Sequence, residues 1–230
     1  MQGSAVNTVV LFDVNETLLD LRVLEPLFSR VFGSAEARKV WFRQMLLLAF
    51  QATILDQYRP FGEHGRGALR MLSHQLERPL SAGHEQAILD QMKHLPAFPD
   101  VAPGLARLRG AGVRLAALTN STEEVGTAQL RHAGILDQFE RVFSADRVRR
   151  LKPAPEPYRM AVREMEVAPE DAWLVAAHGW DVAGAAAAGC RTAFLTRPGM
   201  VLDPLGPAPT LVVADVEALA RRFVEAGAGP

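Results

Sequence analysis

Four groups of polar residues in this chain could do chemistry together. Asp13 ends an apolar run, Thr119 and Asn120 end a second one, and Asp181 follows a third, while Lys152 lies in a proline-rich turn. A carboxylate beside a lysine stays ionised, and an ionised carboxylate can act as a covalent nucleophile. These residue types predict a nucleophilic Asp13, with Lys152 holding its charge.

The other polar residues have expected roles and ordinary structural interpretations. Thr119 and Asn120 are expected to donate hydrogen bonds to the substrate or leaving group, and Asp181 to orient Lys152 or a hydrolytic water. Aspartate is also a common turn former, and "TNS" after a strand is a common helix cap. Because all these residues fall at successive segment ends, the catalytic interpretation is favoured.

Short apolar runs that alternate with helix-like segments must position these residues. The runs are 9–12, 113–119, 172–177, 192–197 and 210–215. Such alternation predicts βαβ units and an α/β fold, with a Rossmann-like, doubly wound parallel sheet as its core. Ligands bind beyond the carboxyl ends of the strands of such a sheet, which is where the polar residues fall.

The segment between the first two apolar runs is different, because it has helical periodicity and no convincing strand. Helices are expected within 21–32, 36–55, 64–76 and 83–95. We therefore predict an α/β core domain over 1–20 and 96–230, with an inserted helical cap domain over 21–95. The stretch 197–209 is rich in proline and predicts a surface loop.

Composition excludes several classes of function. The 230 residues carry a formal net charge of -1, which gives no electrostatic case for nucleic acid or an anionic membrane as a partner. Cys190 is the single cysteine, so an internal disulfide is impossible. The N-terminal "MQGSAVNT" has no basic region, and "MLLLAF" is too short to span a membrane. We expect a soluble, cytoplasmic protein that acts on a small molecule.

Four motifs in order resemble those of a known superfamily. "FDVNETLLD", "LTNST", "LKPAPEPY" and "VAAHGWD" look like the four motifs of the haloacid dehalogenase superfamily, and the helical insertion resembles its C1-type cap. The match covers essentially the whole chain. "KPxxxxY" and "WDxxGAxxxG" resemble most closely the type II branch, the 2-haloacid dehalogenases.

The resemblance implies a metal-independent hydrolase without a cofactor. Asp13 would attack the carbon that bears the halogen, halide would leave, and water would cleave the aspartyl ester. Thr17 would support Asp13, Lys152 would pair with it, and Asp181 would position Lys152 and the water. The candidate substrate-contacting residues are Asn15, Thr119, Asn120, Tyr158, His178, Trp180, Phe42 and Arg43.

The phosphatase branch of the superfamily is the main alternative. Its members typically carry a second aspartate two residues after the nucleophile, where this chain has Asn15, and asparagine cannot serve as a general acid and base. Their fourth motif usually pairs two acidic residues for magnesium, whereas here Ala177 stands in place of a partner for Asp181. A non-catalytic binding protein is a third possibility.

The sequence also departs from the type II pattern. The halide-binding arginine usually follows a cap tryptophan directly, but Phe42 follows Trp41 here and Arg43 comes one place later, about 100° around a helix. His178 stands at a usual asparagine position, and Glu16 at a usual glycine position. These changes leave the exact substrate open and make His178 a candidate site residue. The apolar cap helix could line the site or bury against a second copy, so a homodimer is possible.

Overall fold

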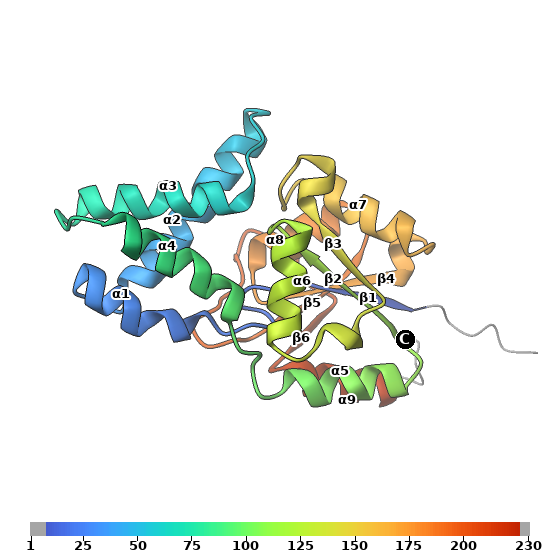
Figure 1. Cartoon of the computed structure of the whole chain (residues 1–230). Helices are drawn as coiled ribbons and strands as arrows, with labels where there is room; N and C mark the ends of the chain where they lie inside the picture. The colour runs from blue at the N-terminus through green and yellow to red at the C-terminus, as the bar shows by residue number, and fades with distance from the viewer. Residues whose placement is uncertain (1–7, 226–230) are drawn as a thin grey trace, which may run out of the picture.

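The computed structural model describes residues 8–225. Figure 1 shows a twisted sheet with helices on both faces, and a block of helices to one side of it. The N-terminal "MQGSAVNT", in which the sequence shows no basic region, lies outside the described residues apart from Thr8. The same holds for residues 226–230, the end of the predicted core domain.

The sheet is parallel throughout, with strand order β3-β2-β1-β4-β5-β6. Its strands are β1 (Val9–Phe12), β2 (Arg114–Thr119), β3 (Arg141–Ser144), β4 (Ala172–Ala176), β5 (Arg191–Leu195) and β6 (Leu211–Val213). From β1 the chain adds β2 and β3 on one side, and then adds β4, β5 and β6 on the other side of β1. The order therefore reverses at β1, where a doubly wound sheet has its ligand-binding crevice.

Successive residues of β1 point to opposite faces of the sheet, and each face has its own core. Val10 and Phe12 pack in a core shared with α5, α6 and α9, whereas Val9 and Leu11 pack with α7 and α8. These helices are α5 (Val101–Gly110), α6 (Glu123–His132), α7 (Pro155–Glu164), α8 (Gly179–Ala187) and α9 (Val216–Glu225). Both faces of the strand are buried, which explains the continuous apolar run. The predicted α/β fold is confirmed.

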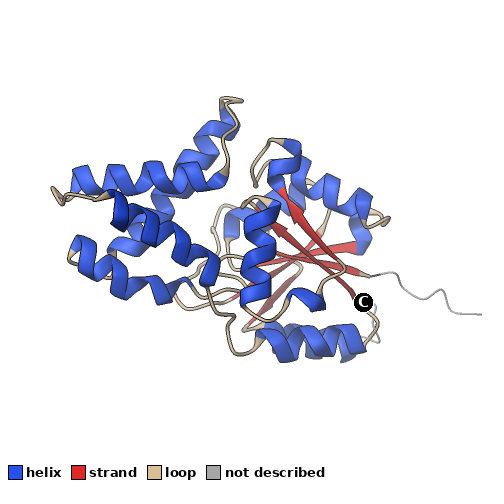
Figure 2. Ribbon diagram, viewed as in Figure 1, coloured by secondary structure: helices blue, strands red, loops and turns tan. Residues whose placement is uncertain are grey.

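The helical block lies between β1 and α5 and contains no strand among its residues, all of which are described. Its elements are η1 (Leu21–Leu24), α1 (Glu25–Phe32), α2 (Ala37–Ile54), α3 (Phe61–Gln75), α4 (Ala82–Gln91) and η2 (Met92–His94). Short 3-10 helices in the core are η3 (Leu136–Gln138), η4 (Ala145–Val148) and η5 (Pro169–Asp171). Figure 2 shows the block as helices and loops to one side of the sheet.

The two chain segments that join block and core run side by side. The amide of Phe98 donates to the carbonyl of Leu18, and the amide of Asp20 donates to that of Pro96, both at 2.9 Å. These bonds flank the predicted boundaries at 20/21 and 95/96, which stay a prediction. By tying the two segments together next to Asp13, they fix the start of the helical block beside the end of β1.

Candidate active site

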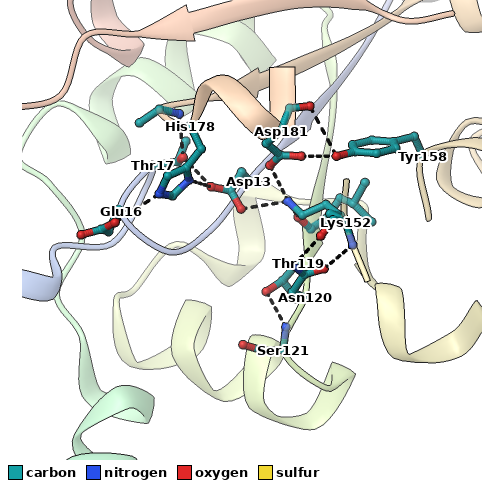
Figure 3. A network of polar contacts seen from close by, with 12 residues as sticks. Asp13, Glu16, Thr17, Thr119, Asn120, Ser121, Lys152, Tyr158, His178 and Asp181 are labelled. Atoms are coloured by element: carbon teal, nitrogen blue, oxygen red, sulfur yellow. Dashed lines mark hydrogen bonds and ion pairs between the residues drawn. The ribbon is translucent and has the colours of Figure 1, made fainter. Parts of the chain in front are cut away.

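Asp13 lies at the carboxyl end of β1, between the ends of β2 and β4. Its amide continues the sheet by donating to the carbonyl of Val175 at 3.0 Å, and its side chain is 7% exposed. The other polar residues come from the end of β2, the turn before α7 and the start of α8. Figure 3 shows these side chains converging on Asp13.

Lys152 joins the two carboxylates of the site. Its fully buried Nζ donates to Asp13 Oδ1 at 2.9 Å, to Asp181 Oδ2 at 2.6 Å and to the carbonyl of Leu118 at 2.9 Å. These three bonds use all three donors of the ammonium group. Burial favours the neutral amine, but the two carboxylates outweigh it and raise the pKa of Lys152. The lysine is therefore held as a cation.

The carboxyl group of Asp13 is ionised. Burial by itself would raise its pKa, but the charge of Lys152 and the hydrogen bond from His178 lower it well below the usual range. Thr17 adds a hydrogen bond from its hydroxyl to Asp13 Oδ2 at 2.6 Å and accepts one from the amide of Ala177 at 2.9 Å. Asp13 thus carries the charge that a nucleophile needs.

Asp181 and Tyr158 lie on the far side of Lys152 from Asp13. The Tyr158 hydroxyl donates to Asp181 Oδ1 at 2.5 Å, while Asp181 Oδ2 accepts from Lys152. Both residues are fully buried, and burial raises the pKa of each. Tyr158 and Lys152 together occupy both oxygens of Asp181, so this carboxylate positions Lys152.

Asn120 contacts the backbone of Lys152. Its Oδ1 accepts from the Lys152 amide at 2.7 Å, and its Nδ2 donates to the Lys152 carbonyl at 3.3 Å. The Thr119 hydroxyl accepts from the amide of Ser121 at 3.1 Å. Both side chains still line the cavity beside Asp13. The Asn120 side chain therefore has a clear function in holding the lysine, which its sequence context did not predict.

The side chain of Asn15 contacts α6. Its Oδ1 accepts from the side-chain amide of Gln129 at 3.0 Å, and the same nitrogen donates to the carbonyl of Met92 at 2.7 Å. Asn15 thereby ties the loop after β1 to the end of the helical block, while its side chain still lines the cavity.

His178 lies between Asp13 and Glu16. Its Nδ1 is 3.2 Å from Asp13 Oδ2, and its Nε2 is 3.1 Å from Glu16 Oε2. The ring is stacked with Phe42 and Trp180, at centroid distances of 6.2 Å and 5.1 Å. Burial would lower the pKa of His178, but the hydrogen bonds to both carboxylates raise it to about 9. At neutral pH the ring is an imidazolium that donates to both.

Glu16 and Arg38 complete the network, and neither was assigned a role from the sequence. Arg38 of α2 donates to Glu16 Oε1 at 2.5 Å, with both residues buried. Glu16 has a φ of 61°, a left-handed conformation that is costly for a non-glycine residue. The one available signal was the glutamate at a usual glycine position. The cations of the network are Arg38, Lys152 and His178, and its carboxylates are Asp13, Glu16 and Asp181, with Glu25 as a fourth at 3.4 Å from Arg38.

The space beside Asp13 is small and has an apolar side. It measures about 10 Å³, and its apolar walls include Phe42, Leu46, Phe61 and Trp180. A volume of this size holds about one water molecule. An organic substrate therefore needs these side chains to move, and three of them belong to the helical block.

Arg43 is not brought to this cavity. It is exposed and lines a wider pocket of about 570 Å³, on whose wall Glu16, Phe42, His178 and Trp180 also lie. Of the two adjacent cap candidates, the structure thus places Phe42 against the nucleophile's cavity and Arg43 outside it. Within residues 8–225, no group of three or more histidine, cysteine, aspartate or glutamate side chains is arranged to hold a metal ion.

Comparison with known proteins decides the family. The family model of haloacid dehalogenase-like hydrolases matches residues 8–189. The chain belongs to this family. It is a haloacid dehalogenase-like hydrolase, and the resemblance expected from its four motifs is confirmed.

The similarity extends along nearly the whole chain. Haloacetate dehalogenase H-2 from Moraxella sp. (strain B) is 28% identical, with 91% of this chain and 95% of that protein covered. An (S)-2-haloacid dehalogenase from Pseudomonas sp. (strain YL) is 27% identical, with 96% and 95% covered. The solved structure of L-2-haloacid dehalogenase from Xanthobacter autotrophicus, with chloropropionic acid covalently bound, is 25% identical with a TM-score of 0.88. It covers 95% of this chain and 98% of that one.

No helix within the described part of the chain is long and apolar enough to cross a membrane.

Proposed function

We propose that this haloacid dehalogenase-like hydrolase cleaves the carbon–halogen bond of a small 2-haloacid through a covalent ester on Asp13. The observation that carries the proposal is the ionised Asp13 carboxylate, fixed by Lys152 beside a small cavity with an apolar side. An anion in such a cavity is poorly hydrated and reacts readily with an electrophilic carbon. The covalently bound chloropropionic acid in the structural relative supports the same route.

The reaction has two steps. In the first, one oxygen of Asp13 forms a bond to the carbon while the carbon–halogen bond breaks, and halide leaves with its electron pair. In the second, water attacks the carbonyl carbon of the ester, and the bond between that carbon and the alkyl-bearing oxygen breaks. The released 2-hydroxy acid carries an oxygen of Asp13, and Asp13 keeps the oxygen of the water.

The second carboxylate and the lysine support both steps. Asp181 and Tyr158 hold Lys152 in place, and Lys152 keeps Asp13 ionised for the attack. In the ester, the same ammonium is placed to protonate the departing alkoxide, and a proton of the attacking water restores it. Thr119 and Asn120 stay candidates for contacts with the substrate, because they line the cavity beside Asp13.

The phosphatase alternative is disfavoured by the surroundings of Asn15. A phosphatase of this superfamily needs a titratable group at that position, and the amide of Asn15 instead accepts a hydrogen bond from Gln129. The ionised Asp13 with its complete set of partners also disfavours a purely binding role.

The direct test is halide release from 2-chloropropionate, bromoacetate and fluoroacetate, measured with a chelator present. We expect release from at least one of them, and none from the Asp13→Asn variant, since an amide oxygen is a poor nucleophile. Release that needs added metal, or no release from folded wild-type protein, would overturn the proposal. An Arg43→Ala variant assayed alongside tests Arg43 as a candidate substrate contact, in which case KM should rise; an unchanged KM fits its place in the wider pocket outside the cavity.

A homodimer is the proposed assembly. Val40, Leu47 and Ile54 recur at intervals of seven along α2 and are all exposed, so they form an apolar stripe on one face of the helix. The opposite face supplies Phe42 and Leu46 to the cavity. Sedimentation of wild type and Leu47→Glu tests this, with a dimer and a monomer expected; a monomeric wild type contradicts it. A cytoplasmic location stays a prediction from the single cysteine.

A further inference from the structure

The two oxygens of Asp13 are not equivalent. Oδ1 accepts one hydrogen bond, from Lys152, while Oδ2 accepts two, from Thr17 and His178. Each carboxylate oxygen has two lone pairs, so Oδ2 is fully engaged and Oδ1 has one lone pair free. The free lone pair makes Oδ1 the oxygen that can attack carbon.

We infer that Oδ1 is the attacking oxygen and that Thr17 and His178 form an oxyanion site at Oδ2 for the hydrolysis of the ester. This inference rests on the proposed function and assigns the second step to residues that the family resemblance left without that role. In the ester, Oδ2 is the carbonyl oxygen. It becomes negative when water adds to the carbonyl carbon, and donors already aimed at it stabilise that charge.

The bonds and protons of the step balance. The oxygen of water bonds to the carbonyl carbon, and the electron pair of the C=O bond moves to Oδ2. As that pair returns, the bond from carbon to Oδ1 breaks and Oδ1 leaves with the 2-hydroxy acid, protonated by Lys152. One proton of the water restores Lys152, and the other is released to solvent. His178 keeps its proton throughout.

His178 cannot instead hold the leaving halide. Its two N–H groups both point to carboxylates, at Asp13 and at Glu16. Halide departs from the side of the carbon opposite the attacking oxygen, whereas the Nδ1 atom lies 3.2 Å from the other oxygen of the same carboxylate. His178 therefore acts at the nucleophile, and the missing cap arginine is not replaced by it.

Glu16 has a specific purpose in this scheme. When Asp13 becomes an ester it loses its charge, and the imidazolium loses one of its two anionic partners. Glu16 remains, itself fixed by Arg38 at 2.5 Å, and keeps the ring protonated when the oxyanion forms. This role gives a reason to keep a non-glycine residue at a φ of 61°. The charged groups that contact the ring are Asp13 and Glu16. Lys152 and Arg38 pair with these two carboxylates, and Asp181 and Glu25 pair with Lys152 and Arg38 in turn.

The scheme predicts a pH dependence for the second step. His178 has a pKa of about 9 with both carboxylates charged, and its pKa is lower in the ester, where only Glu16 is charged. The imidazolium is lost as pH rises through that lower pKa, so ester hydrolysis slows towards alkaline pH. Glu16→Gln removes the remaining charge and should move the decline to still lower pH.

The test follows both steps by rapid quench, with the substrate that the wild type turns over. Halide release reports the first step, and intact-protein mass reports the ester. For His178→Asn we expect a halide burst of about one per site, ester that accumulates, and hydrolysis slowed by roughly 10²–10³-fold. For Glu16→Gln we expect a milder slowing with the shifted pH profile. Exposed His74→Asn and Glu77→Gln, the latter also at a left-handed position, are the matched controls.

The outcomes separate this inference from the proposed function. A wild type that releases no halide refutes both. Where the wild type forms the ester, one result for His178→Asn refutes the oxyanion site alone. That result is an equal slowing of the halide burst and of turnover, with no accumulated ester. An unshifted pH profile in Glu16→Gln also refutes it; this change conserves size, but its single amide oxygen can accept from only one of Arg38 and His178. Thermal melts of each variant show whether the protein used is folded.

Discussion

Replacing Lys152 with methionine removes the one cation that Asp13 and Asp181 share. Methionine has a similar length, so the change takes away three hydrogen bonds and a charge but little volume. Two carboxylates are then left buried without that cation, and removal of one partner from a buried ion pair costs about 3–5 kcal/mol. We expect a loss of that size in the free energy of unfolding at pH 7.

The size of the loss should depend on pH. Without Lys152, burial raises the pKa of Asp181 further above its unfolded value, and the pKa of Asp13, which keeps its hydrogen bonds from His178 and Thr17, rises from its lowered wild-type position. A carboxyl group whose pKa is higher in the folded than in the unfolded state contributes its full stabilisation below the unfolded-state pKa. That contribution is lost as pH rises through the folded-state pKa. Wild-type Asp13 has a lowered pKa, so its contribution is instead lost as pH falls below about 4. The gap between variant and wild type should therefore shrink in acid.

Urea unfolding of wild type, Lys152→Met, Asp181→Asn and the double variant, at pH 7 and pH 5, measures these differences. The double variant should be less destabilised than the sum of the two single changes, because the Asp181→Asn change leaves one buried charge fewer. A Lys152→Met protein within about 1 kcal/mol of wild type at pH 7, or one with a pH-independent loss, would refute the reasoning.

Three further predictions concern the supports of the site. A Cβ at Gly184 would lie 2.7 Å from the Pro153 carbonyl and the Tyr158 hydroxyl, so Gly184→Ala should destabilise the fold by about 1–3 kcal/mol and lower kcat. Gly62 has open space around it, so in thermal melts Gly62→Ala should be neutral or slightly stabilising. Tyr158→Phe removes a 2.5 Å hydrogen bond to Asp181 and should lower the free energy of unfolding by about 1.5–3 kcal/mol. An unchanged midpoint of urea unfolding would contradict this. Arg197 donates twice to Asp100 and once to the carbonyl of Thr17, so Arg197→Ala should lower the free energy of unfolding by about 3–5 kcal/mol. Arg141 is exposed, so the control Arg141→Ala should leave that free energy nearly unchanged.

Most of the sheet was predictable because its strands are buried on both faces. Five strands coincide with continuous apolar runs, which periodicity detects directly. The sixth, β3, was not anticipated. It has only four residues at the edge of the sheet, with an exposed Arg141 and just two apolar side chains, Val142 and Phe143. Its place is set by pairing with β2, a contact that local sequence does not encode.

The convergence of the polar residues was predictable for the same reason that the sheet was. Parallel strands end at one edge, so Asp13, Thr119 and the start of α8 had to meet there. Side-chain directions were not predictable. Asn120 contacts the Lys152 backbone, 32 residues away, and Arg38 reaches Glu16 from the helical block. Both contacts depend on tertiary packing, which spacing in the sequence cannot give.

The central claim is that Asp13 attacks carbon and that water then attacks Asp13. A single turnover in oxygen-18 water, with enzyme in excess and peptide mass analysis afterwards, tests it directly. The account predicts one labelled oxygen in the peptide that contains Asp13 and an unlabelled 2-hydroxy acid. A labelled product with an unlabelled Asp13 peptide would show that water attacks the substrate itself, and would contradict the account.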